Sequence, residues 1–442
     1  MPYGPYPPRT VASVTADLTI RLLTPDLDWD QYLDLNARSF GPVDEARVRA
    51  NIGPIVADGR CLGALEGNRM VGFALFLDMR QWWHGRAVPM AGVAGVKIAP
   101  EDRGRGIGRA VMTALVELMA ERGYPMAVLY PATMTIYRSL GWEIAGHRQE
   151  ARLPARSLFA LARADVGAAA QSPGDLRRPG PDDAARVLDV IGGAYALARD
   201  CGPVTYDEAT VRRWLTRPGR YADADRYAYL ASDGFLAYRW QRGHDEIVVE
   251  HLTAASAGTT RALWRVVASN SSVADAVHAQ LGPSDPLWWL LPEQDASIAD
   301  RRSWMLRLLD APAAIAARGF PATDLAVPLR ITDDLRPANA GLWQLSVRDG
   351  TGCLSEVRTG QGDSPRPAAS FPGSGVAPPD GVSPPGGTHL PLALGARGLA
   401  ALYAGTPVAT LRRAGLASGG SPAADAALDG AFAATPYMLD SF

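Results

Sequence analysis

The sequence predicts an α/β protein with mixed sheets, built from three consecutive parts. Between Val93 and Gly123 an apolar segment is followed by a glycine-rich turn and then by apolar residues at three- and four-residue steps, which is the pattern of a strand, a turn and a helix. Residues 176–264 faintly repeat the order of the first part, and the pattern changes again from Trp304. A chain of 442 residues holds about three domains of ordinary size. We place the domains at residues 1–167, 168–298 and 299–442.

The composition is that of a globular protein and argues against several classes of partner. Hydrophobic residues make up 47% of the chain and charged residues 20%, and the formal net charge of -2 provides no general attraction for nucleic acid. No apolar run reaches the length of a membrane span, and the proline-rich start does not have the pattern of a signal sequence, so we expect a cytoplasmic protein. The three cysteines and six histidines show no metal-ligand spacing, so we expect neither a disulfide framework nor a metal.

The first part begins with elements that can be read from periodicity and from turn residues. We predict a strand at 18–22, a helix at 26–40, and a hairpin of two strands at 61–66 and 70–77. Asp28 is the expected N-cap of the helix. Residues 80–86 are predicted to form a loop that carries Trp82 and Trp83, which either line a pocket or fill an interface.

The central segment has the features of a phosphate-binding turn. Residues 93–99 are apolar and partly β-branched, which suits a buried strand, and Pro100 ends it because proline cannot donate to a sheet ladder. A helix is predicted to begin near Gly104. Its first N–H groups have no partner within the helix and carry the positive end of the helix dipole, so they can hold a phosphate or pyrophosphate. Arg103 and Arg105 add positive charge at the rim.

The spacing of the glycines distinguishes between kinds of nucleotide site. A P-loop needs Gly-Lys-Ser/Thr, whereas Lys97, the one lysine of the chain, precedes the turn. A dinucleotide fingerprint needs G-x-G-x-x-G, whereas Gly104, Gly106 and Gly108 give G-x-G-x-G. The pattern Arg103-x-x-Gly106-x-Gly108 resembles that of the GNAT acyltransferase superfamily, in which this turn holds the pyrophosphate of acetyl-CoA. An ordinary glycine-rich turn is the alternative interpretation.

A tyrosine follows the next predicted strand, at 126–129. The segment 132–141 reads as a short helix closed by Gly141, with Tyr137 in its middle. In GNAT enzymes a tyrosine at this place stands beside the thioester sulfur, and Tyr137 matches it. A phenol, with an ordinary pKa of about 10, is a reasonable acid for a departing CoA thiolate. The alternative is that Tyr137 only packs in the core.

The second part echoes the first without its phosphate-binding turn. Residues 168–180 have the composition of a linker, and residues 227–240 echo the earlier hairpin. Residues 249–264 supply the strand and helix of the central segment but lack R-x-x-G-x-G. We infer a second GNAT-like domain that has lost the cofactor, with Trp288 and Trp289 expected to close its core.

The last part ends in an unusual tail. We predict a helix at 312–318, strands at 325–331 and 341–347, a helix at 396–404, and further elements at 390–394 and 408–411. Residues 359–387 are dense in glycine, proline and serine and are predicted to form a mobile loop. The chain stays apolar up to Phe442, and docking of this terminus inside the protein would explain that.

These three parts in this order resemble the Eis (enhanced intracellular survival) family of acetyltransferases. That resemblance implies a catalytic GNAT domain, a degenerate GNAT domain and a sterol-carrier-protein-like domain. It also implies acetylation of amines with acetyl-CoA, several members acting on aminoglycoside antibiotics, and assembly as hexamers. The residues that it implies for acetyl-CoA binding are Val96, Ile98, Arg103, Gly104, Arg105, Gly106, Ile107 and Gly108. It implies Tyr137 as the general acid and the terminal carboxylate of Phe442 as the base.

The acceptor amine is the open part of this interpretation. A terminal carboxylate, with a pKa of about 3.5 in free peptides, is too weak a base to deprotonate an ammonium outright, so we expect it to orient the amine or to act through a water. The residues considered for contact with a cationic acceptor are Asp28, Trp29, Trp82, Trp83 and Asp440. Acetylation of protein lysines or polyamines stays an alternative to aminoglycosides. An apolar-ligand carrier regulated by CoA is the rival from another functional class.

Overall fold

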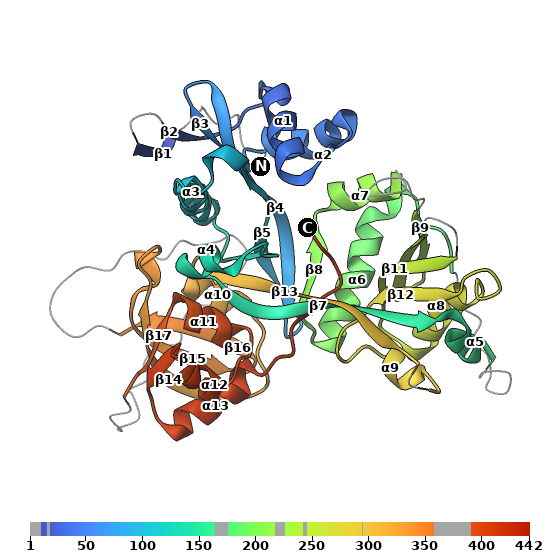
Figure 1. Ribbon diagram of the computed structural model, residues 1–442. Helices are drawn as coiled ribbons and strands as arrows, with labels where there is room; N and C mark the ends of the chain where they lie inside the picture. Colours follow the sequence, from blue (N-terminus) through green and yellow to red (C-terminus); the bar gives the residue numbers. More distant parts are fainter. Residues whose placement is uncertain are drawn as a thin grey trace.

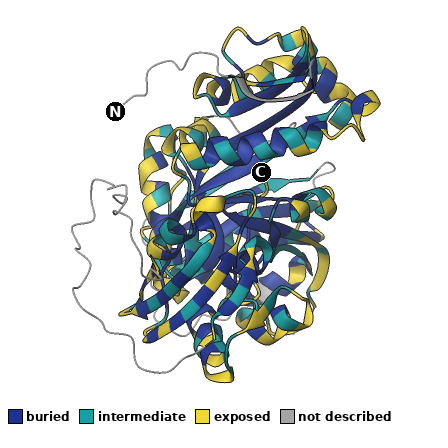
Figure 2. Cartoon of the chain, turned by 90° about the vertical axis from the view of Figure 1, so that its left-hand side faces the viewer, coloured by how far each residue is buried: buried dark blue, intermediate teal, exposed yellow. Residues whose placement is uncertain are grey.

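The computed structural model describes residues 10–15, 18–163, 176–216, 226–241, 245–293, 295–357 and 390–442. Over these residues the chain forms a 14-stranded mixed sheet and a separate five-stranded sheet, with helices packed on both (Figure 1). The buried residues concentrate on the strands, and the outer faces of the helices are exposed (Figure 2). The predicted class, an α/β protein with mixed sheets, is confirmed.

The first unit supplies one half of the large sheet. Its strands are β1 (Thr10–Thr15), β2 (Leu18–Leu22), β3 (Cys61–Glu66), β4 (Arg69–Trp83), β5 (Arg86–Ile98), β6 (Met126–Leu129) and β7 (Glu143–Pro154). Its helices are α1 (Trp29–Phe40), α2 (Glu45–Ala57), α3 (Ile107–Glu121), α4 (Met134–Ser139) and α5 (Ala155–Arg163), with a 3-10 turn at Pro100–Asp102. The strands predicted at 18–22, 61–66 and 126–129 have the predicted bounds. The predicted cap is also confirmed, because the Asp28 side chain accepts a hydrogen bond from the Gln31 N–H.

Two predictions in this unit are wrong. Residues 80–86 do not form a loop, because β4 continues through Trp83 and β5 resumes at Arg86. Gln81 and Trp83 are fully buried and alternate with more exposed neighbours, as expected for a strand. This end of β4 pairs with β5 on one edge and with β8 on the other. The central helix begins at Ile107 rather than near Gly104, because Gly104 has a φ of 83° and lies outside helical geometry.

The second unit joins the first through an exchange of strands. Its strands are β8 (Cys201–Tyr206), β9 (Arg226–Leu230), β10 (Gly234–Trp240), β11 (Glu246–Ala254), β12 (Ala276–Gln280) and β13 (Ser297–Leu308). Its helices are α6 (Ala184–Ala198), α7 (Glu208–Thr216), α8 (Ala257–Ala268) and α9 (Leu287–Leu290), with a 3-10 turn at Pro181–Asp183. β13 inserts between β6 and β7, while β7 pairs with β12 of the second unit. Residues 299–308, which we had assigned to the last domain, therefore lie in the large sheet.

The C-terminal unit is built on the five-stranded sheet, in the order β16-β15-β14-β17-β18. Its elements are α10 (Ala311–Ala317), β14 (Leu325–Thr332), a 3-10 turn (Pro337–Asn339), β15 (Gly341–Arg348), β16 (Thr351–Glu356), β17 (Leu392–Gly395), α11 (Ala396–Tyr403), α12 (Val408–Arg413), β18 (Ala417–Gly419), α13 (Pro422–Phe432) and β19 (Tyr437–Met438). The predicted loop at 359–387 lies outside the described residues.

Trp83 lies where the three units meet. Its ring packs against Trp304 and Tyr403, with ring centroids 6.4 and 5.0 Å away, and the Arg318 guanidinium lies 5.1 Å from its centroid. Trp83 is fully buried, and its indole N–H donates to Gln81. It therefore fills an interface, which leaves it no surface for an acceptor. Trp289 is 71% exposed and does not close the core of the second unit, unlike its neighbour Trp288.

Candidate active site

The first feature of the site is a gap between two parallel strands. β5 and β6 pair only from Met90 to Gly92 on the β5 side, where the partners run from Met126 to Val128. β5 then continues to Ile98, while β6 ends at Leu129. Beyond Gly92 one edge of β5 is therefore without a strand partner from β6, and its N–H and C=O groups are available to an extended ligand.

A β-bulge lies on this open part of β5. In the ladder with β4, Leu75 pairs with Ala94 and Phe73 pairs with Lys97, so Gly95 and Val96 together lie opposite one residue. Gly95 has a φ of 62°, a backbone conformation that favours glycine. Because a bulge breaks the regular ladder, Val96 lies at the position where the backbone of β5 can turn a donor toward a ligand.

The second feature is the start of α3. The N–H groups of Gly106, Ile107, Gly108 and Arg109 have no hydrogen-bond acceptor among the residues that the structure describes, and the first bond of the helix runs from Ala110 N to Gly106 O at 3.1 Å. A Cβ added at Gly106 would meet nothing within 4 Å, so open space adjoins this backbone. Unpaired donors, a helix dipole and free room fit a pyrophosphate.

The two arginines of this turn differ in their surroundings. The Arg105 guanidinium binds Asp102 at 2.5 Å and also Glu66, and Arg69 binds the same two carboxylates. The charge of Arg105 is therefore largely compensated within the protein. Arg103 is exposed and forms no ion pair within the described part of the chain.

This difference gives a prediction for acetyl-CoA binding. Arg103→Ala is expected to raise the KM for acetyl-CoA about tenfold, because a charge-assisted hydrogen bond to phosphate contributes about 1.5 kcal/mol or more. Arg105→Ala serves as the matched control and is expected to change this KM less, since its partners are Glu66 and Asp102. Initial rates at varied acetyl-CoA measure both variants; an equal or larger effect at Arg105 would contradict the assignment.

Tyr137 lies on α4, which packs against the start of α3 and against β5. A Cβ at Gly108 would lie 3.4 Å from Ile136 and 3.6 Å from Ile98, so the glycine allows this close contact. Tyr137 is buried, with its ring centroid 6.3 Å from that of Trp142, and its hydroxyl has no hydrogen-bond partner among the described residues. Burial raises the pKa of Tyr137, so the phenol is protonated at neutral pH and has a proton to donate.

The third feature is the docked C-terminus. β19 pairs in parallel with β7, with Tyr437 opposite His147 and Met438 opposite Arg148. Met438 and Leu439 are buried, which confirms that the apolar tail docks inside the protein. Figure 1 shows the last residues running between the first and second units and ending beside β8.

Phe442 reaches the point where β5 and β6 diverge. Its ring lies 3.1 Å from where a Cβ of Gly92 would be, and Gly92 is the last residue of β5 that pairs with β6. Tyr130, immediately after β6, fixes the tail: its hydroxyl donates to the Asp440 carbonyl at 2.7 Å, and its ring centroid lies 5.6 Å from that of Phe442. We had not assigned Tyr130 a role, although an aromatic residue directly after the strand was a visible signal.

The second unit provides a seat for Tyr437. Gly202 has a φ of 103°, and a Cβ there would lie 2.4 Å from the Tyr437 carbonyl oxygen, so no other residue fits without displacing the tail. A Cβ at Gly282 would lie 3.0 Å from the Tyr437 ring. The Tyr437 hydroxyl donates to Asp200. Burial raises the pKa of Asp200 to about 6. The hydrogen bond from Tyr437 lowers this pKa, but its effect is smaller than that of burial.

The seat predicts a pH dependence of stability. Because the pKa of Asp200 is about 6 in the folded protein and 3.8 as its ordinary value, the folded state keeps a proton that the unfolded state releases between pH 4 and 6. The free energy of unfolding therefore falls as pH rises through this window, by on the order of 3 kcal/mol. Asp200→Asn does not titrate, so its melting temperature should exceed that of the wild type above pH 6 and approach it near pH 4. If the melting temperatures of the wild type and Asp200→Asn changed in parallel with pH, this prediction would be wrong.

The other residues considered for the acceptor are not brought together. Asp28 caps α1, and the Arg49 guanidinium lies 5.0 Å from the centroid of the Trp29 ring. Trp82 packs against Gly192 and Tyr195 of α6. Asp440 alone of this group lies beside Phe442, with its Oδ2 4.0 Å from Nδ1 of His251.

Comparisons with known proteins agree with this geometry. Residues 19–145 and 202–308 each match the family described as the acetyltransferase (GNAT) domain, and residues 311–439 match the sterol carrier protein domain. A solved GCN5-related N-acetyltransferase from Kribbella flavida is 42% identical, with a TM-score of 0.81, over 96% of this chain and 98% of that chain. The chain belongs to the GCN5-related N-acetyltransferase family. It is an acyltransferase with tandem GNAT domains and a sterol-carrier-like domain, as the sequence predicted.

Relatives of this N-acetyltransferase include Eis proteins. N-acetyltransferase Eis of Mycobacterium tuberculosis is 29% identical over 357 residues, which cover 75% of this chain and 84% of that protein. Eis1 of Mycobacterium abscessus, at 23% identity, shares the fold with a TM-score of 0.70 over 96% of this chain and 100% of that chain. The predicted resemblance to the Eis family is confirmed. None of the described helices of the acetyltransferase is long and apolar enough to span a membrane, and no group of three potential metal ligands occurs among the described residues.

Proposed function

We propose that this GCN5-related N-acetyltransferase transfers an acetyl group from acetyl-CoA directly to a primary amine of a small molecule. The observation that carries the proposal is the position of Phe442, whose ring contacts Gly92 where β5 and β6 separate. The terminal carboxylate belongs to the same residue as this ring, so we expect its charge to lie near the thioester. Such a position suits the capture and orientation of an amine.

The residues present fit acetyl-CoA. The N–H groups of Gly106 and Ile107 and the exposed Arg103 would hold the pyrophosphate, and the free edge of β5 would hold the pantetheine arm. Acetyl-CoA supplies the activated acyl group as a thioester. The Val96 N–H, at the bulge, would donate to the thioester oxygen and stabilise the negative charge that develops there.

Two groups move the protons of the reaction. The amine nitrogen forms a bond to the acetyl carbon, and the proton that it loses passes to the Phe442 carboxylate directly or through a water. The C–S bond breaks, and the buried Tyr137 hydroxyl protonates the CoA thiolate. Both groups return to their starting states when the Phe442 carboxyl releases its proton to water and the Tyr137 phenolate takes one up from water. The acetyl group passes directly from sulfur to nitrogen, so no covalent enzyme intermediate is formed.

The acceptor class follows from resemblance more than from geometry. The Eis resemblance favours a cationic small molecule such as an aminoglycoside, with protein lysines and polyamines as the alternatives. The sterol-carrier-like domain keeps a different function open, in which the chain carries an apolar ligand and CoA only regulates it.

A panel of acceptors tests the proposal. Thiol release from acetyl-CoA is followed with aminoglycosides, polyamines, lysine peptides and arylalkylamines, with binding of acetyl-CoA measured separately by calorimetry. Turnover with one class is the expected result. If acetyl-CoA binds and no amine is acetylated, while an apolar ligand binds tightly, the carrier function replaces the enzymatic one.

A further inference from the structure

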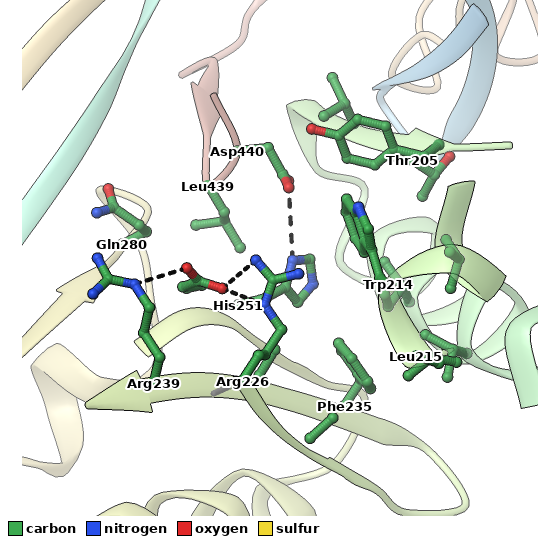
Figure 3. A pocket seen from close by; sticks show the side chains of 18 of the residues that line it. Thr205, Trp214, Leu215, Arg226, Phe235, Arg239, His251, Gln280, Leu439 and Asp440 are labelled. Atoms are coloured by element: carbon green, nitrogen blue, oxygen red, sulfur yellow. Dashed lines mark hydrogen bonds and ion pairs between the residues drawn. The ribbon is translucent and has the colours of Figure 1, made fainter. Parts of the chain in front are cut away.

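A cavity of about 330 Å³ lies in the second unit, which lacks the acetyl-CoA turn. It lies among α6, α7 and the strands β8 to β12, and its wall is completed by β7 of the first unit and by the C-terminal residues Leu439, Asp440 and Ser441 (Figure 3). Its volume is at the small end of the range for small-molecule sites. None of the roles assigned above uses this cavity.

The wall of the cavity is mostly apolar. Aromatic and aliphatic side chains come from a helix and two strands: Val204, Trp214, Leu215, Phe235 and Ala237. Figure 3 shows Trp214, Leu215 and Phe235 on the same side of the cavity. The Trp214 ring is held edge-on to Tyr206, with centroids 4.7 Å apart. Such a wall binds an aromatic or branched aliphatic group.

The charges on the wall do not suit a polycation. Four arginines and three carboxylates line the cavity. Glu250 is held between Arg226 and Arg239, at 2.5 and 3.1 Å, so its charge is compensated (Figure 3). Burial lowers the pKa of His251 to about 4, so this side chain is neutral at pH 7. The lining therefore carries more positive than negative side chains, which disfavours an acceptor with several positive charges.

A buried polar atom also marks the cavity as a binding site. Gln280, which is 3% exposed, is one of the lining residues, and its Nε2 donates to Glu150 at 2.8 Å. Its Oε1 is buried and has no hydrogen-bond partner in the described structure. An unsatisfied buried acceptor is costly, and a donor on a bound ligand removes that cost.

The tail connects this cavity to the reaction centre. Ser441 lines the cavity, and the next residue, Phe442, contacts Gly92 at the divergence of β5 and β6. Consecutive Cα atoms are about 3.8 Å apart, so the cavity begins within one residue of the terminal carboxylate. A ligand of the cavity can therefore present a group to the acyl donor across the tail.

We propose that this cavity holds the apolar body of the acceptor, whose amino group passes Asp440 toward the Phe442 carboxylate. The acceptor class is then a primary amine with a single positive charge and an aromatic or branched aliphatic group, rather than a polycation. The proposal rests on the proposed acetyl transfer, and it replaces the polycationic acceptor that the resemblance favours by an amine with one positive charge. Trp214 and its neighbours are specificity-determining residues, because they select the body of the acceptor.

Two variants and one matched control test the proposal. Trp214→Ala removes part of the wall, and Ala228→Leu fills the cavity from β9, so the two changes act in opposite ways on the volume. Trp289→Ala removes a tryptophan of the same unit that is 71% exposed and does not line the cavity. Melting temperatures establish that each variant is folded. The acceptors are phenethylamine, tryptamine, methylamine, spermidine and an aminoglycoside.

The expected result is a change that depends on the acceptor. The wild type should have a kcat/KM for tryptamine at least tenfold above that for spermidine. Trp214→Ala and Ala228→Leu should raise the KM for tryptamine about tenfold while leaving the KM for acetyl-CoA and the kcat/KM for methylamine unchanged. Trp289→Ala should match the wild type with every acceptor. Calorimetric titration of phenethylamine should show binding to the wild type and its loss in both cavity variants.

The inference and the proposed function fail in different ways. If the polyamine or aminoglycoside is the best acceptor and the cavity variants acetylate it normally, the inference is overturned while acetyl transfer stands. If no amine is acetylated although acetyl-CoA binds, the proposed function is overturned, and the acceptor role of the cavity with it. The inference is also overturned if folded cavity variants lose methylamine turnover as well as tryptamine turnover. The cavity would then affect catalysis in general and not the choice of acceptor.

Discussion

Two residues added after Phe442 are expected to abolish acetyl transfer while acetyl-CoA binding survives. The addition moves the terminal carboxylate by up to about 7 Å and replaces it by a neutral peptide group. The Phe442 ring holds the last residue beside Gly92 and Tyr130, so the added residues carry the charge away from this position. The loss should exceed a hundredfold in kcat, the scale on which a general base contributes. Thiol release, calorimetry with acetyl-CoA and the melting temperature measure the three quantities.

A second variant separates the carboxylate from the aromatic ring. Phe442→Leu keeps a terminal carboxylate at the same position in the chain and loses the ring contacts with Tyr130 and Gly92, so we expect it to keep most of its turnover. The same two residues added at the N-terminus control for the presence of an extension. Normal turnover in the folded C-terminal extension would remove the catalytic role of Phe442.

Tyr137→Phe is expected to lower kcat for acetyl transfer by about 10²- to 10⁴-fold, because the CoA thiolate then leaves without its proton donor. The KM for acetyl-CoA should stay within about twofold, since the hydroxyl is one atom among the contacts of the cofactor. Removing a hydroxyl that makes no hydrogen bond within the described residues should also leave the fold intact. Steady-state kinetics with the best acceptor of the panel and a thermal melt measure these effects.

Tyr32→Phe is the matched control for this variant. Tyr32 is a buried tyrosine of the same unit whose pKa is also raised by burial, and it packs in the separate cluster under α1. Removing the Tyr32 hydroxyl should leave the kcat for acetyl transfer unchanged. Equal kcat values for Tyr137→Phe and the wild type would show that Tyr137 only packs in the core.

Local sequence signals predicted the parts of the site that are continuous in the chain. The strand before the turn, the glycines that start α3 and the helix around Tyr137 each depend on neighbours within one segment, so periodicity and glycine spacing were sufficient. The Asp28 cap was predictable for the same reason, because the interaction spans three residues. The family resemblance added the roles of these residues, which no local pattern contains.

Contacts between distant segments were not predictable in this way. Asp200, Gly202 and Gly282 contact Tyr437 from separate segments of the second unit. In the sequence each of them is an ordinary loop or strand residue, and only the folded position of the tail reveals its role. The insertion of β13 between β6 and β7 was equally unpredictable, because the sequence of residues 297–308 does not indicate which strands they pair with. Local sequence also left open whether Trp83 lines a pocket or fills an interface, because its burial depends on Trp304 and Tyr403, far along the chain.

The measurement that tests the central claim most directly is the identification of the product. Wild-type protein is incubated with acetyl-CoA and the best acceptor of the panel, and the acceptor is analysed by mass spectrometry while free thiol is counted. The account predicts an amine that carries one acetyl group, with one CoA released for each acetyl transferred. Thiol release without an acetylated amine, or an acetyl group retained on the protein, would contradict direct transfer to an amine.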